Sequence, residues 1–104
     1  MERRKVKEMN KKMKVYVVGH SGPEHNSIQS MHKTYEGAFK AWDKLRIDLL
    51  KDAENSLKRY ESDKDRWHIE MYQKMVKNLS CKDPEKIDNG PHETPYILKW
   101  DLEE

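Results

Sequence analysis

A long run of apolar residues at helical spacing constrains this chain more than any other feature of its sequence. Between residues 35 and 60, apolar side chains recur every three or four positions, within an arc of about 120° at 100° per residue. This pattern predicts one amphipathic helix whose stripe must be covered by other parts of the chain. Thr34 is a suitable N-cap, and Glu36 in the first turn favours the helix dipole. The stripe consists of Tyr35, Ala38, Phe39, Trp42, Leu45, Leu49, Ala53, Leu57 and Tyr60.

Two short segments that predict strands precede this helix. Lys14–Gly19 (KVYVVG) is β-branched and aromatic, ends at a glycine and predicts a strand, and Ile28–Lys33 predicts a second strand. The segment between them, His20–Ser27, contains Gly-Pro and Asn turn signals. Together they predict a β-hairpin with a loop that is longer than usual, and such loops often carry function.

The end of the chain also alternates like a strand. In Tyr96–Leu102, one face carries Tyr96, Leu98, Trp100 and Leu102, and the other carries Ile97, Lys99 and Asp101. We expect this strand to pair with the first strand and to pack its aromatic face beneath the helix. No repeat of any segment is visible.

A second helix is predicted over Asp63–Leu79, after a polar break in which Ser62 and Asp65 resemble a capping box. Its apolar residues cover an arc of about 200°, and a face that wide is normally covered on two sides. The first helix is about 39 Å long, whereas the strands span only about 20–23 Å. The second helix can cover the overhang as a hairpin, although a continuous rod fits the sequence too.

These elements predict an α+β fold. A three-stranded sheet, made of the hairpin and the C-terminal strand, packs on the long amphipathic helix, and the second helix forms a helical extension. Residues 13–104 are expected to form a single domain, and residues 1–12 a flexible basic arm. The arm holds six Lys/Arg and two Glu, a net charge of +4.

The composition argues against several classes of protein. The longest apolar run, Val15–Val18, is too short for a membrane span, and the charged residues 1–12 do not resemble a signal peptide. Cys81 is the only cysteine, which excludes an internal disulfide and favours the cytoplasm. The segment Gly19–Pro23 (GHSGP) departs from a nucleophile elbow, and the five histidines lack metal-ligand spacing. We therefore expect no enzymatic activity, no cofactor and no metal.

Arg46 and the surplus apolar face of the second helix each allow two interpretations. Arg46 lies within the apolar stripe, where it either extends past the sheet edge to solvent or pairs with an acid at an interface. The second helix either completes the core or binds a partner. The candidate partner-binding residues, on this helix and the hairpin loop, are Trp67, Ile69, Tyr72, Val76, His20, Glu24, His25 and Asn26. A homodimer through the helical pair is compatible with this surface.

Three segments resemble small proteins of tailed bacteriophages and other mobile elements. They are Met13–Val18 (MKVYVV), Thr34–Phe39 (TYEGAF) at the helix start, and the ending of Tyr96–Leu102 in Trp-Asp-Leu. The resemblance covers about half of the chain and implies an early viral protein that binds a bacterial host or defence protein and modulates it, with inhibition as the expected effect. It implies no catalytic residues.

Nucleic-acid binding is the alternative function. The sheet offers Tyr16, His32, Tyr96 and Trp100 as stacking candidates, although packing under the helix explains them equally. The basic arm supplies phosphate contacts through Arg3, Arg4, Lys5, Lys7, Lys11 and Lys12.

Overall fold

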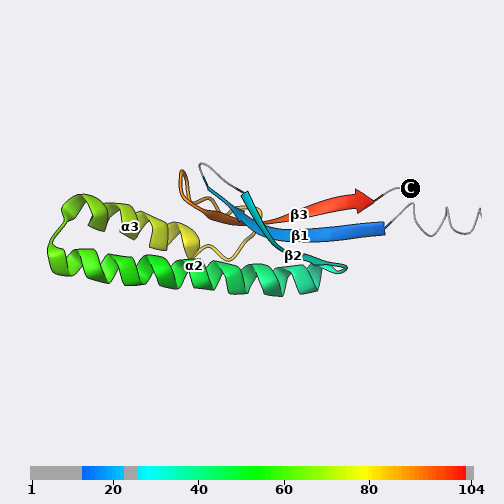
Figure 1. The fold of residues 1–104 in the computed structure, drawn as a ribbon, viewed down its shortest axis with the longest axis horizontal. Coiled ribbons are helices and arrows are strands. Elements are labelled where there is room, and N and C mark those ends of the chain that lie inside the picture. Colours follow the sequence, from blue (N-terminus) through cyan, green and yellow to red (C-terminus); the bar gives the residue numbers. More distant parts are fainter. Residues whose placement is uncertain (1–12, 23–25, 103–104) are drawn as a thin grey trace, which may run out of the picture.

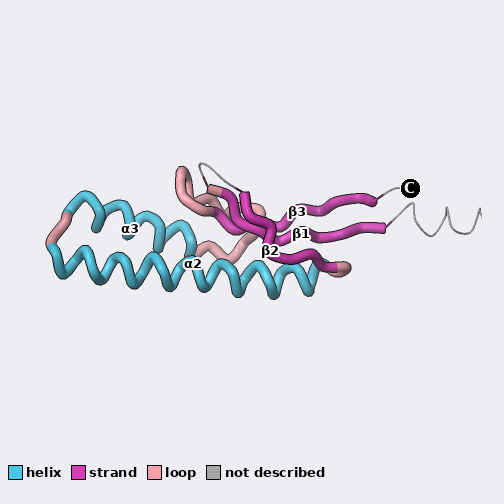
Figure 2. The backbone as a smooth tube through the Cα atoms, viewed as in Figure 1, coloured by secondary structure: helices cyan, strands magenta, loops and turns pink. Residues whose placement is uncertain are grey.

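The elements of the computed structural model, which describes residues 13–22 and 26–102, follow the chain order β-β-α-α-β (Figure 1). The strands are β1 (Met13–Ser21), β2 (Asn26–His32) and β3 (Thr94–Leu102), and the helices are α2 (Tyr35–Asp63) and α3 (Arg66–Leu79). The strands form one antiparallel sheet of order β2-β1-β3. The sheet lies on the N-terminal half of α2, and α3 lies along its C-terminal half (Figure 2). This architecture confirms the predicted α+β class.

β1 is the central strand and pairs with both of its neighbours. Its register with β3 runs without a shift from Met13 opposite Leu102 to Ser21 opposite Thr94, which confirms the predicted pairing of the first and last strands. The pairing with β2 is less regular, because the register shifts between Val18 and Gly19. β2 and β3 begin two residues earlier than predicted and β1 ends two residues later, since main-chain pairing continues into residues such as Ser21, Asn26 and Thr94 that carry no hydrophobic signal.

The core between the sheet and α2 is small. Val18 of β1 and Ala38 and Trp42 of α2 are fully buried, and Tyr16 and Ile97 pack against this cluster from the sheet. Val18 lies opposite Ile97 in the register, so both side chains point to the same face. The helix therefore covers the face of the sheet that carries Tyr16, Val18 and Ile97.

α2 begins where the sequence predicts. The Thr34 side-chain oxygen accepts a hydrogen bond of 3.1 Å from the Gly37 backbone N–H, which confirms Thr34 as the N-cap. The helix continues to Asp63, beyond the predicted end at Tyr60.

The turn between the helices differs in detail from the prediction. Lys64 adopts a left-handed conformation with a φ of 58°, and Asp65 then caps α3 by accepting from the backbone N–H of His68. Ser62, which resembled the cap in the sequence, lies inside the last turn of α2. The carboxylate of Asp65 takes its place because the chain reverses at Lys64, which brings Asp65 to the free N–H groups of α3.

α3 folds back on α2, so the two helices form a hairpin and not a rod (Figure 1). Tyr60 of α2 stacks on His68 and Tyr72 of α3, with ring centroids 4.3 Å and 5.5 Å away. At the other end of α3, buried Leu79 joins Ile87 of the following loop in the core cluster. The wide apolar face of α3 is thus covered by α2 and in part by the chain's own loop.

Asp65 makes the stability of the hairpin turn sensitive to acid. The hydrogen bond from the His68 ring (Nδ1 to Oδ2, 2.7 Å), followed by that from the His68 backbone N–H, holds the pKa of the Asp65 carboxyl below its ordinary value. A lowered pKa means that the carboxylate stabilises the folded state above the ordinary pKa, and that this contribution disappears as the pH falls below about 4.

We expect the variant Asp65→Asn, which keeps a capping oxygen but has no charge, to lose this part of the acid sensitivity. The measurement is the urea midpoint of both proteins between pH 2 and pH 7. The difference between them should shrink as Asp65 becomes protonated in the original chain. A constant difference across this range would show that the Asp65 charge does not stabilise the turn.

Arg46 does not extend to solvent; it pairs with an acid, Asp43 of its own helix, where α2 meets the end of α3. Its side chain is 4% exposed and its guanidinium donates to the Leu79 carbonyl at 2.8 Å and to the Asp43 carboxylate at 2.8 Å and 3.0 Å. The guanidinium carbon also lies 5.8 Å from the centre of the Trp42 ring. Arg46 is therefore an internal brace between the two helices. The helical hairpin brings the Leu79 carbonyl, at the C-terminal end of α3, to the guanidinium, which satisfies it with a hydrogen bond.

Candidate functional site

The face of the sheet opposite α2, here called the outer face, exposes a group of large apolar side chains. Side chains alternate along a strand, so the residues next to Val18 and Ile97 point away from the helix. Met31 and Leu98 flank Val17 in the register, and Ile28 and Trp100 lie farther along. The exposed fractions are 50% for Ile28, 56% for Met31, 44% for Leu98 and 39% for Trp100.

This arrangement reverses one expectation from the sequence. Alternation in the last strand suggested that Tyr96, Leu98 and Trp100 pack beneath the helix, but it is Ile97 that packs against the core on the α2 side. Lys99 shares that side and stays exposed. Alternation separates two faces without saying which one meets the helix, and here the more apolar face is the uncovered one.

At one end of the outer face, Tyr96 lies over a glycine. A Cβ atom on Gly19 would come within 2.6 Å of the Tyr96 hydroxyl oxygen and 2.5 Å of the Ser27 carbonyl oxygen, so only glycine fits here. The Tyr96 hydroxyl donates to the Asn26 side-chain oxygen, which fixes the ring. This end of the face is polar and held in place, whereas the other end is apolar.

The outer face carries no charge in the part of the strands whose side chains the structure describes. Charged types make up 38% of the chain, so their absence from a whole face is a marked bias. Val17 is fully buried there, although it belongs to the face that neither α2 nor α3 covers. The residues concerned are Val15, Val17, Gly19, Ser21, Asn26, Ile28, Met31, Thr94, Tyr96, Leu98 and Trp100.

The candidate residues of the second helix are not equally available. Trp67 is 67% exposed, and Ile69 is half-buried. Tyr72 and Val76 pack against the core cluster, so their main role is to stabilise the fold. Among the large apolar residues of α3, only Trp67 is exposed to the degree seen on the outer face.

The hairpin-loop candidates are separated from one another. His20 is mostly buried, with its ring Nδ1 3.4 Å from the Glu93 carboxylate, and Asn26 is engaged with Tyr96. Glu24 and His25 lie outside the described residues. The same holds for the basic arm, with Arg3, Arg4, Lys5, Lys7, Lys11 and Lys12.

The stacking candidates for nucleic acid are divided between the two faces. Tyr16 and His32 lie on the α2 side, where Tyr16 packs against the core and meets Tyr35 edge-on at 5.8 Å. Tyr96 and Trp100 lie on the outer face. The sheet therefore does not present these four rings as one platform.

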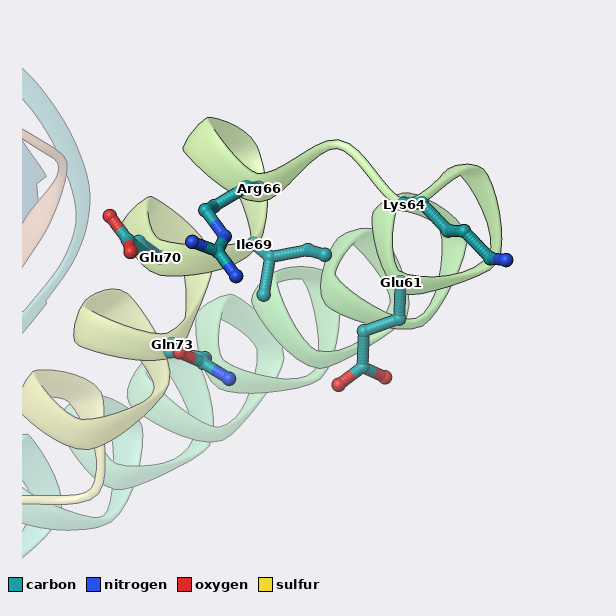
Figure 3. A pocket seen from close by; sticks show the side chains of 6 residues that line it. All are labelled: Glu61, Lys64, Arg66, Ile69, Glu70 and Gln73. Carbon is teal, nitrogen blue, oxygen red and sulfur yellow. The ribbon is translucent and has the colours of Figure 1, made fainter.

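A depression of about 690 Å³ at the tip of the helical hairpin is lined by charged residues (Figure 3). The charged groups of Glu61, Lys64 and Arg66 point in different directions and do not converge on one position. Nowhere in residues 13–22 and 26–102 do three or more metal-ligating side chains gather as a metal site would require. The depression therefore lacks the converging groups from which a catalytic mechanism could be derived.

Comparisons with known proteins add no relative to these observations. A scan against protein-family models finds no match, and searches of the curated proteins and of the solved structures find none either. No helix among the described residues is long and apolar enough to cross a membrane. The function must be inferred from the surface of the protein.

Proposed function

We propose that this chain is a small non-enzymatic binding protein that holds another protein against the outer face of its sheet. The observation that carries the proposal is an apolar face whose described side chains include no charge, with Ile28, Met31, Leu98 and Trp100 exposed, in a highly charged chain. Contiguous exposed apolar surface of this kind marks interaction sites on soluble proteins. Depletion of charge, with aromatic and Met residues, is typical of interface cores.

The chemistry of this face favours a protein partner with an apolar patch of its own. Binding of nucleic acid depends on Lys and Arg contacts to phosphates, and the described outer face offers none. A flexible methionine such as Met31 can adjust to an irregular apolar partner surface. From the sequence resemblance, we extend the proposal to a bacterial host or defence protein as the partner, inhibited in the cytoplasm.

The test uses the original chain and its variants as baits and compares how much of the partner protein each one retains. The double variant Ile28→Lys/Met31→Lys places charges on the outer face at half-exposed positions, so unfolding free energy should change by no more than about 1 kcal/mol. The original chain should retain a bacterial protein in a stoichiometric amount. The double variant should retain about thirtyfold less of it, or even less, as expected for the loss of interface-core residues. Bound protein is quantified by mass spectrometry after nuclease treatment.

The control is Trp67→Lys, which places a lysine at the exposed tryptophan of α3. This variant should retain the partner as well as the original chain does. Loss of retention by Trp67→Lys but not by the double variant would move the binding surface to α3. Retention that disappears with nuclease would instead favour nucleic-acid binding by the basic arm.

A further inference from the structure

We infer that two copies of this chain associate through the open edge of β3, about a two-fold axis at Trp100. β3 has β1 on one side, and no strand of the described residues pairs with its other side. Its register with β1 is unbroken over the whole strand, so the open edge is regular. β2, the other edge, is shorter and its register is shifted, and irregular edges resist further pairing.

The charges of β3 favour one register for this association, the one that places Lys99 opposite Asp101. When a strand pairs with its own copy in an antiparallel sheet, the two-fold axis passes through a residue that faces itself. An axis at Trp100 places Lys99 opposite Asp101 of the second copy, and the symmetry makes this contact twice. An axis at Lys99 or Asp101 would instead place like charges opposite each other, and like charges directly opposite are destabilising.

The same register also covers apolar surface. Trp100, 39% exposed, faces its own copy across the axis on the outer face, with Leu98, 44% exposed, beside it. Lys99 and Asp101 are both exposed on the other face, so they are free to meet the second copy. Cross-strand pairs of aromatic residues and of opposite charges are those that stabilise antiparallel strands.

The product would be one continuous sheet of two three-stranded halves, in the order β2-β1-β3-β3-β1-β2. Because the two-fold axis is perpendicular to the sheet, the helices of both copies lie on one side. The two outer faces then lie side by side on the other. The association leaves Ile28 and Met31 uncovered, since β2 lies at the far edge, and it doubles the apolar face available to a partner.

The test is the mass of the purified full chain in sedimentation equilibrium, up to millimolar concentration. We expect a dimer of twice the 12.5 kDa chain mass. Lys99→Asp places Asp opposite Asp101 of the second copy, and Asp101→Lys places Lys opposite Lys99. Because each variant replaces two attractive contacts by two repulsive ones, each should raise the dissociation constant about tenfold or more.

Mixing the two single variants separates a broken interface from a damaged fold. In the mixed pair every contact again joins Lys to Asp, so a heterodimer with the original affinity should form, and the double variant Lys99→Asp/Asp101→Lys should also recover. A monomeric original chain, single variants that dimerise unchanged, or a mixture that stays monomeric would each overturn the inference. Because only purified chain is used, the result is independent of whether the outer face binds a partner.

Discussion

Replacing Trp42 by alanine is expected to lower the free energy of unfolding by about 3–5 kcal/mol. Trp42 is fully buried and lies in the cluster that joins the sheet to the helices, packed against Phe39 with ring centroids 5.5 Å apart. Among the described residues, Trp42 is the largest fully buried side chain, so its removal leaves a large cavity. A small domain has only about 5–15 kcal/mol of stability in total. Urea unfolding followed by circular dichroism measures the loss.

Trp67→Ala is the matched control, since it removes the same side chain from a position that is 67% exposed on α3. Its unfolding free energy should stay within about 0.5 kcal/mol of the original. Equal losses for the two variants would contradict the placement of Trp42 in the core and of Trp67 on the surface.

Removing Arg46 is expected to have the second largest effect on stability. Arg46→Ala leaves the Leu79 carbonyl without its 2.8 Å hydrogen bond, deprives Asp43 of its partner and opens a space beside Trp42. An unsatisfied buried acceptor and the lost packing together should cost about 2–4 kcal/mol. Because Leu79 ends α3, amide hydrogen exchange should rise first in the last turns of that helix.

Arg59→Ala serves as the comparison for Arg46→Ala. Arg59 is exposed on the same helix and lies 5.5 Å from the centre of the Tyr60 ring, a contact of about 0.5–1 kcal/mol at an exposed site. If Arg46→Ala cost no more than Arg59→Ala, Arg46 would not be a brace between the helices.

The elements with a strong local signal were predictable from the sequence. Thr34 caps α2 as expected, because an N-cap depends only on the next few residues. The pairing of β1 with β3 was also predictable, since both segments are apolar and terminal in the domain. The cap of α3 at Asp65 was harder, because it depends on the left-handed turn at Lys64, and lysine carries no signal for that conformation.

Features that depend on distant contacts could not be predicted. The partner of Arg46 is the Leu79 carbonyl, 33 residues away, which meets it only when the helical hairpin is closed. Ile87 is buried although it stands in an irregular loop without periodicity. Neither side of β3 is marked in the sequence as the one that meets α2, so the outer face became a candidate site only with the fold.

The residues of the candidate site could not be predicted for the same reason, since their exposure depends on distant contacts. Tyr72 and Val76 looked like surplus apolar residues because the width of a helical face says nothing about how many neighbours cover it. Ile28 and Met31 carry no interface signal in the sequence, because they are isolated apolar residues in a polar strand. They gain significance only from their position beside Val17, Leu98 and the rest of the outer face.

Photo-cross-linking in bacterial cells tests most directly whether the outer face is the binding surface. A photoreactive phenylalanine analogue replaces Met31, on the strand remote from the β3 edge, and in a second chain it replaces Trp67. We predict one discrete adduct with a bacterial protein from position 31 and none from position 67. An adduct from position 67 alone, or none from position 31, would contradict binding through the outer face.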